Sequence, residues 1–81
     1  MSISIEARVD GNEWKYTAGY SSLDAAKTAC REMRKTGLVG RISDMDFRIY
    51  YNDRLELVNV RESRWRLRWV PGNGKSRKDQ S

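Results

Sequence analysis

The sequence contains no histidine, one cysteine, one proline and no long run of apolar residues. Without histidine, the side chain that most often acts as a general base near neutral pH is missing. Cys30 has no second cysteine with which to form a disulfide, and a Cys/His zinc site is excluded. The cysteine content is typical of a reducing, cytoplasmic compartment, and we expect neither a metal nor a cofactor.

The chain also lacks a basic and then apolar N-terminal segment, so neither secretion nor membrane insertion is expected. Charged residues make up 33% of the 81 residues and hydrophobic residues 38%, which is enough for one modest core. We expect a single domain over residues 1–71. A flexible basic tail over residues 72–81 is expected to follow it, because that segment has no apolar residue.

The positive charge is concentrated near the end of the chain. The formal net charge is +5, and residues 61–78 alone hold seven basic residues and one acidic residue. The rest of the chain holds nine basic and ten acidic residues. Arginine also outnumbers lysine eleven to five, which favours forked contacts to carboxylates or phosphates.

Alternating apolar and polar residues predict strands on both sides of a single helix. Residues 2–9 and 13–18 alternate around the turn sequence DGN, which predicts a hairpin. Four later segments carry strand patterns: residues 38–43, 47–51, 55–60 and 64–70. Pro71 is expected to end the last of them.

Residues 19–37 carry the helical pattern. Ser21 or Ser22 can cap the start of this helix, and Gly37 can end it. Its apolar stripe consists mostly of small side chains, which let a helix lie close to a sheet: Leu23, Ala26, Ala29, Cys30 and Met33.

The predicted order is therefore strand–strand–helix–strand–strand–strand. An antiparallel sheet of four to five strands with the helix packed on one face is the simplest way to bury these stripes. The fold class is thus α+β, and the other face of the sheet is expected to be open to water.

The stretch RWRLRWV at residues 64–70 is the strongest candidate for a functional surface. Its two tryptophans and its leucine are expected to face the helix, because burying the arginines instead would be costly. Arg64, Arg66 and Arg68 then form a row on the open sheet face, with neighbours about 6.6–6.8 Å apart. Solubility explains any one of these arginines, whereas their alignment favours a binding surface.

Other residues are expected to extend this basic surface. On neighbouring strands and on the tail these are Lys15, Arg48, Tyr50, Lys75, Arg77 and Lys78. An exposed tyrosine among arginines suits stacking on a base or anchoring in a protein interface. The exposed side of the helix is a second, weaker basic surface, formed by Lys27, Arg31, Arg34 and Lys35.

Catalysis is not expected. Asp44 and Asp46 have a D-x-D spacing, which we interpret as turn chemistry rather than as a metal or acid–base pair. A small arginine/tyrosine ribonuclease, as in some bacterial toxins, works without histidine. No candidate base is placed beside the arginines and tyrosines of this sequence, so we predict a protein that is not an enzyme.

Three kinds of partner fit a basic sheet surface. One is DNA or RNA, contacted through backbone phosphates with little sequence specificity. Another is an acidic protein, or a protein–nucleic acid complex with an acidic surface. The third is a second copy of the chain, so both a monomer and a homodimer stay open.

The layout resembles that of small phage-encoded anti-CRISPR proteins that inhibit type I systems. The resemblance is carried by the helix YSSLDAAKTACREM, the following GRISD strand and the late SRW strand. It implies a non-enzymatic inhibitor in the bacterial cytoplasm that binds the Cascade surveillance complex through a basic surface and blocks target DNA binding. It implies no individual contact residues.

Overall fold

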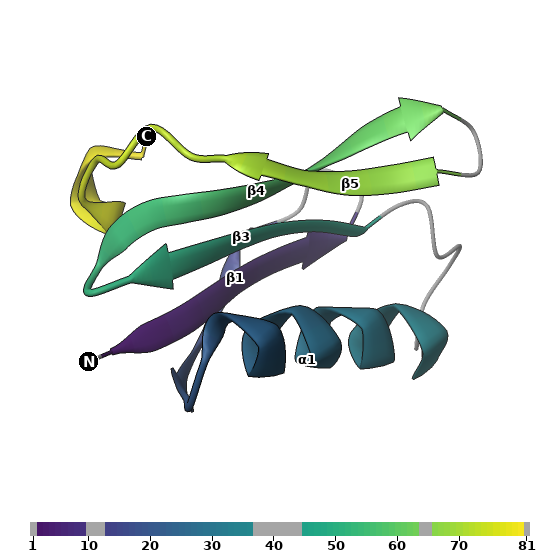
Figure 1. The fold of residues 1–81 in the computed structure, drawn as a ribbon, viewed down its shortest axis with the longest axis horizontal. Helices are drawn as coiled ribbons and strands as arrows, with labels where there is room; N and C mark the ends of the chain where they lie inside the picture. Colours follow the sequence, from purple (N-terminus) through teal and green to yellow (C-terminus); the bar gives the residue numbers. More distant parts are fainter. Residues whose placement is uncertain (1, 10–12, 37–44, 64–65, 81) are drawn as a thin grey trace.

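The computed structural model describes residues 2–9, 13–36, 45–63 and 66–80. These form an α+β fold in the predicted order, with one helix packed on a five-stranded antiparallel sheet (Figure 1). The strands are β1 (Ile3–Val9), β2 (Lys15–Tyr20), β3 (Met45–Tyr51), β4 (Arg54–Ser63) and β5 (Arg66–Pro71), and α1 (Leu23–Thr36) joins β2 to β3. The strand expected at residues 38–43 lies outside the described residues.

The sheet order is β2–β1–β3–β4–β5, so β1 and β3 lie side by side although the helix separates them in sequence. Their register pairs Ile5 with Ile49 and Ala7 with Phe47. Directly opposed residues point to the same face of an antiparallel sheet, so this register gathers the apolar side chains of both strands under the helix.

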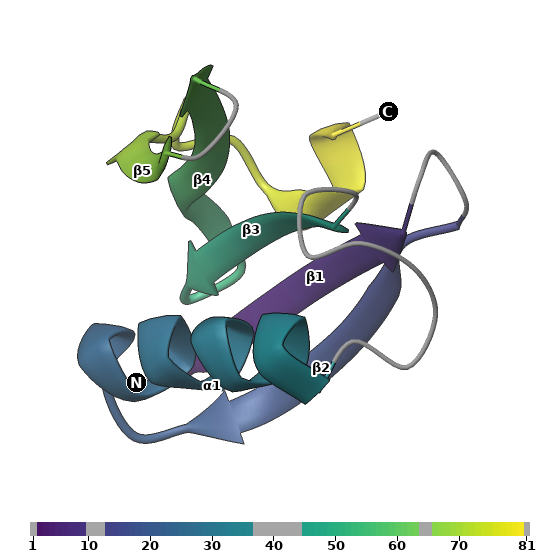
Figure 2. The ribbon, with the colours of Figure 1, turned by 90° about the vertical axis from the view of Figure 1, so that its right-hand side faces the viewer.

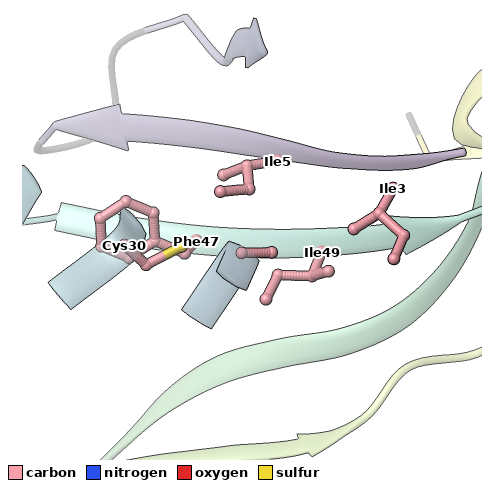
Figure 3. Packing of buried hydrophobic residues seen from close by; sticks show 6 residues of the cluster. Ile3, Ile5, Cys30, Phe47 and Ile49 are labelled. Atoms are coloured by element: carbon pink, nitrogen blue, oxygen red, sulfur yellow. The ribbon is translucent and has the colours of Figure 1, made fainter. Parts of the chain in front are cut away.

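The helix begins as predicted, because the side-chain oxygen of Ser22 accepts a hydrogen bond from the backbone N–H of Ala25 at 3.0 Å. The helix packs against β1, β2 and β3. The core between helix and sheet is made of fully buried side chains (Figure 3): Ile3, Ile5, Ala26, Cys30, Phe47 and Ile49.

Cys30 is a core residue, as the sequence predicts. It is 1% exposed, and burial raises the pKa of its thiol to about 12. A thiol that stays protonated at neutral pH is a packing group rather than a nucleophile.

Arg34 corrects the expected exposed face of the helix. Its guanidinium donates hydrogen bonds to the backbone oxygen of Met45, at 3.1 Å, and to the side-chain oxygen of Asn59. It also lies over the ring of Phe47, with 4.8 Å from Cζ to the ring centroid. Arg34 therefore points toward the sheet, where it satisfies the buried Asn59 on β4.

The β4–β5 hairpin lies on the part of the sheet remote from the helix, which packs on β1, β2 and β3 (Figures 1 and 2). Trp69 of β5 packs against the core on the helix side, as predicted for that residue. Trp65, whose burial was also predicted, lies outside the described residues.

The C-terminal segment, residues 72–80, differs from the expected flexible tail. The backbone N–H groups of Gly72 and Gly74 donate to Glu56 and Leu55 of β4, at 2.8 and 3.0 Å. A 3₁₀ turn, η2 (Arg77–Asp79), follows and lies on the side of the sheet opposite the helix (Figure 2). Backbone hydrogen bonds and ion pairs, rather than apolar contacts, hold this segment in place.

Gly72 shows how closely this segment approaches the sheet. A Cβ atom at this position would lie 2.6 Å from the backbone oxygen of Leu55, a distance that real Cβ contacts do not reach. The close approach buries Leu55, which is 5% exposed, on the face away from the helix.

Candidate functional site

The face of the sheet away from the helix carries two distinct groups of side chains. The first, which we call the Glu6 network, consists of Glu6, Arg48, Tyr50 and Arg77. The second, the hairpin surface, consists of Val58, Val60, Arg66, Arg68 and Val70. The register assigns both groups to this face, since Glu6 opposes Arg48, and Arg48 opposes Val58.

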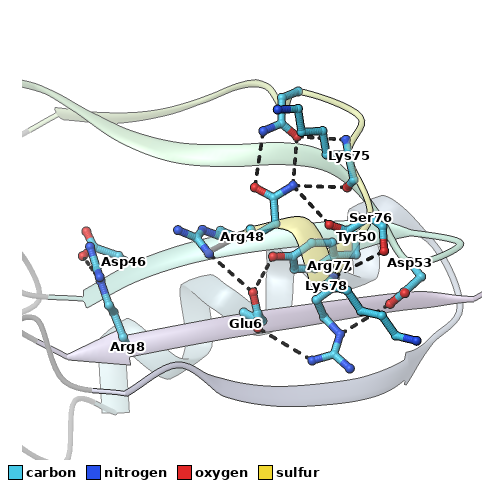
Figure 4. Close-up of polar contacts among 12 residues, drawn as sticks. Glu6, Arg8, Asp46, Arg48, Tyr50, Asp53, Lys75, Ser76, Arg77 and Lys78 are labelled. Atoms are coloured by element: carbon cyan, nitrogen blue, oxygen red, sulfur yellow. Dashed lines mark hydrogen bonds and ion pairs between the residues drawn. The ribbon is translucent and has the colours of Figure 1, made fainter.

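The Glu6 network is centred on a carboxylate that is almost buried, because the residue is 9% exposed (Figure 4). The Tyr50 hydroxyl donates a hydrogen bond to Oε1 of Glu6. An Arg48 nitrogen lies 3.7 Å from the same oxygen, and an Arg77 nitrogen lies 3.9 Å from Oε2. Arg77 also reaches Asp53 at 3.4 Å, so it joins the C-terminal segment to β1 and to the β3–β4 turn.

Aromatic rings complete this layer. The guanidinium carbons of Arg8 and Arg48 lie 4.5 and 4.0 Å from the centroid of the Trp14 ring. Arg77 stacks on Tyr16, at 4.1 Å. Cation–π contacts of this kind are worth about 0.5–1 kcal/mol at exposed sites.

The charged side chains around Glu6 form ion pairs with one another. Each arginine of this layer has a carboxylate partner, including Arg8, which pairs with Asp46 at 3.0 Å. An external anion would have to displace these carboxylates before it could bind. The layer therefore holds the C-terminal segment against the sheet and is a poor site for phosphate.

Tyr50 makes the stability of the protein fall at high pH. Burial, and then the hydrogen bond to Glu6, raises the pKa of Tyr50 from 10.0 to about 12. The unfolded chain loses this proton first, so the stabilisation is complete below about pH 10 and is lost as the pH rises toward 12. We expect the urea midpoint, followed by tryptophan fluorescence, to fall over this range by less in Tyr50→Phe than in the parent protein.

Cys30 also has a raised pKa, and its effect on stability has the same sign. Both proteins should therefore be compared in a Cys30→Ala background. Equal decreases of the midpoint with pH in the two proteins would contradict the assigned role of Tyr50.

The hairpin surface differs because its arginines have no acidic partner among the described residues. Arg66 and Arg68 are exposed, and within the described part of the chain neither forms an ion pair. Because β5 alternates regularly and Trp69 packs toward the helix, both arginines point to the opposite side. They are separated by about 6.6–6.8 Å along the strand.

The structure thus gives two members of the predicted arginine row the expected orientation. Arg64 lies outside the described residues. Lys75 and Lys78 are exposed on the C-terminal segment, and Arg77 is turned toward Glu6.

The structure changes the expected face of one other predicted site residue and the expected exposure of two more. Lys15 opposes Ala7, which places it on the helix side of the sheet rather than beside the arginines. Tyr50 is 0% exposed and cannot stack on a partner. Arg48 is on the expected face, but it is half-buried between Glu6 and the Trp14 ring.

On the helix, Lys27, Arg31 and Lys35 follow one another at intervals of four residues along one side. Arg31 and Lys35 are exposed, whereas Lys27 is half-buried. Without Arg34, this row is the part of the predicted second basic surface that remains on the outside of the helix.

The sequence interpretation missed the role of Glu6 and placed Asp46 in a turn, whereas Asp46 lies in β3. Alternation alone places Glu6 on the other face of its strand from Ile5, and Arg48 on the other face of its strand from Ile49. The missing information was that β1 pairs with β3, because this pairing joins residues far apart in the chain.

No group of metal-ligating side chains occurs within residues 2–9, 13–36, 45–63 and 66–80. Over the same residues, the helix is too short and too polar to span a membrane. In comparisons with known proteins, no family model, no curated protein and no solved structure matches the chain.

Proposed function

We propose that this protein is a non-enzymatic binding protein, and that it inhibits a type I Cascade complex by docking its hairpin surface on an acidic protein patch. Two exposed arginines, aligned on β5 at the edge of the sheet and without an acidic partner among the described residues, are the observation that carries this proposal. The resemblance to anti-CRISPR proteins supplies the identity of the partner. Docking would block binding of target DNA to the complex.

The hairpin surface is better suited to this role than the other basic groups. Arg66 and Arg68 gain carboxylate partners on binding without losing any, since no ion pair within the described residues engages them. Arg48 and Arg77 would first have to leave Glu6. Exposed positive charges at the edge of the sheet also steer the approach of an acidic partner.

The net charge of +5 argues against mimicry of DNA as the inhibitory mechanism. A basic protein is attracted to acidic protein surface, or to nucleic acid, rather than to the positively charged DNA path of the complex. The proposed mechanism is therefore occlusion from a neighbouring acidic patch.

The test compares binding of a purified, guide-RNA-loaded type I Cascade complex to immobilised variants. Arg66→Glu/Arg68→Glu should weaken binding at least about 30-fold, because two attractive contacts become repulsive. The matched control, Arg31→Glu/Lys35→Glu, makes the same change of charge on the helix and should stay within about threefold. No binding by the parent protein, or equal losses in both variants, would contradict the proposal.

Nucleic acid is the second candidate partner, and Tyr16 is the observation that favours it. This residue is 44% exposed on the face away from the helix and is backed by Arg77. Bases stack on exposed aromatic rings, and Lys75 and Lys78 on the same C-terminal segment as Arg77 are free to meet phosphates. A fluorescent single-stranded oligonucleotide of about 20 nucleotides tests this: binding should fall steeply with salt and be lost in Tyr16→Ala.

A further inference from the structure

The hairpin surface also contains apolar side chains that the helix-side core does not use. Val58 and Val70 oppose each other across β4 and β5, and Val60 opposes Arg68. All three valines are half-buried, and none belongs to the core that packs against the helix. We call them the valine strip.

Among the described residues, neither the helix nor the C-terminal turn covers this strip. The helix lies on the other side of the sheet, and the C-terminal turn lies by the start of β4, away from the far end of the hairpin (Figure 1). Arg66 and Arg68 border the strip along β5, and Arg48 borders it on β3. The face is thus an apolar strip with cationic edges.

We propose that the valine strip is the contact site for an amphipathic acidic segment of a partner protein, whose apolar side chains cover the valines while its carboxylates meet Arg66 and Arg68. This inference rests on the proposed binding role of the hairpin surface and adds the chemistry of the partner. The segment must combine both kinds of side chain, since charge alone leaves the strip exposed to water.

Two other occupants fit the face less well. A nucleic acid backbone offers charge and hydration but no aliphatic surface, so it would gain nothing from the valines. A second copy of the chain would bring Arg66 and Arg68 up to their own counterparts, and like charges in contact disfavour association. An acidic and apolar protein segment meets both requirements at once.

The test measures fluorescence anisotropy with three labelled probes. These are an acidic amphipathic peptide of about 15 residues with leucines on one helical face, the same peptide with serines in place of the leucines, and oligo-dT of similar length. The parent protein should bind the leucine peptide at least about tenfold more tightly than the serine peptide. Equal affinities for the two peptides, or tighter binding of oligo-dT, would overturn the inference.

Two variants separate this inference from the proposed function. Val60→Thr/Val70→Thr keeps the β-branched shape but adds hydroxyls, so the strip loses its apolar character while the strands keep their propensity. It should lose the preference for the leucine peptide, whereas Arg66→Glu/Arg68→Glu should lose binding of both peptides.

A threonine variant that binds the Cascade complex as well as the parent protein, and still prefers the leucine peptide, would overturn the role of the strip. The proposed function would stand in that case. If neither variant loses binding to the Cascade complex, the proposed function itself is contradicted. Circular dichroism and thermal unfolding of both variants establish that each is folded.

Discussion

Phe47→Ala is expected to lower the free energy of unfolding by about 3–5 kcal/mol, which is a large part of the total for a chain of this size. Phe47 is 0% exposed and packs in the cluster that contains Ile5, Cys30 and Ile49. The Arg34 guanidinium also lies over its ring, so the substitution leaves a cavity and removes a cation–π contact. Urea unfolding followed by circular dichroism measures the loss.

Phe47→Leu is the matched control, because it retains most of the apolar volume. It should cost clearly less than the alanine variant, on the order of 1 kcal/mol. A loss below about 1 kcal/mol for Phe47→Ala would show that the helix does not pack on β3 as described.

Glu6→Gln is expected to have the second largest effect, about 2 kcal/mol, because it removes the charge that Tyr50, Arg48 and Arg77 share. Glutamine has nearly the same shape, so packing is retained while Arg48 loses its counter-charge and Arg77 keeps only Asp53. The half-exposed position of Arg77 keeps the expected effect below that of a fully buried ion pair. Urea unfolding gives the magnitude.

Hydrogen exchange locates the same effect. In Glu6→Gln, the backbone amides of Arg77 and Gly74 should exchange faster, because Arg77 no longer ties the C-terminal segment to β1. Glu13→Gln is the control, since it makes the same chemical change at an exposed residue. Unchanged exchange at Arg77 would contradict the holding role of the Glu6 network.

The sequence predicted the parts of the fold that depend on local periodicity. The alternation in residues 3–9 and 66–70 correctly separated the apolar from the polar face, so Ile5 and Trp69 lie toward the helix and Arg68 lies away from it. The small apolar side chains of the helix correctly predicted its close packing, including the burial of Cys30.

The parts that could not be predicted depend on contacts between distant segments. Tyr50 alternates like an exposed residue, yet it is fully buried and its hydroxyl donates a hydrogen bond to Glu6. Lys15 was placed on the wrong face because the register of the hairpin, and not alternation alone, decides where each residue of β2 points. A glycine-rich, polar segment gave no periodic signal that it would fold back onto β4.

The two groups of side chains on the face away from the helix differ in whether their arginines can bind a partner. Those near Glu6 are engaged with carboxylates and aromatic rings, and they stabilise the layer that closes over β1 and β3. Arg66 and Arg68 lie beside an uncovered valine strip without acidic partners among the described residues. Protein interfaces commonly combine arginines that can form new ion pairs with an adjoining apolar surface.

Hydrogen exchange of this protein, alone and with a saturating amount of guide-RNA-loaded type I Cascade complex, tests the proposed binding surface most directly. We predict slower exchange on binding in β4 and β5, over residues 57–71, with little change in α1. β5 is an edge strand of the described sheet, so its outward amides exchange readily in the free protein, and a partner on the adjoining face lowers their access to water. Protection confined to α1 or to residues 72–80, or no protection anywhere, would contradict the assignment of the hairpin as the binding surface.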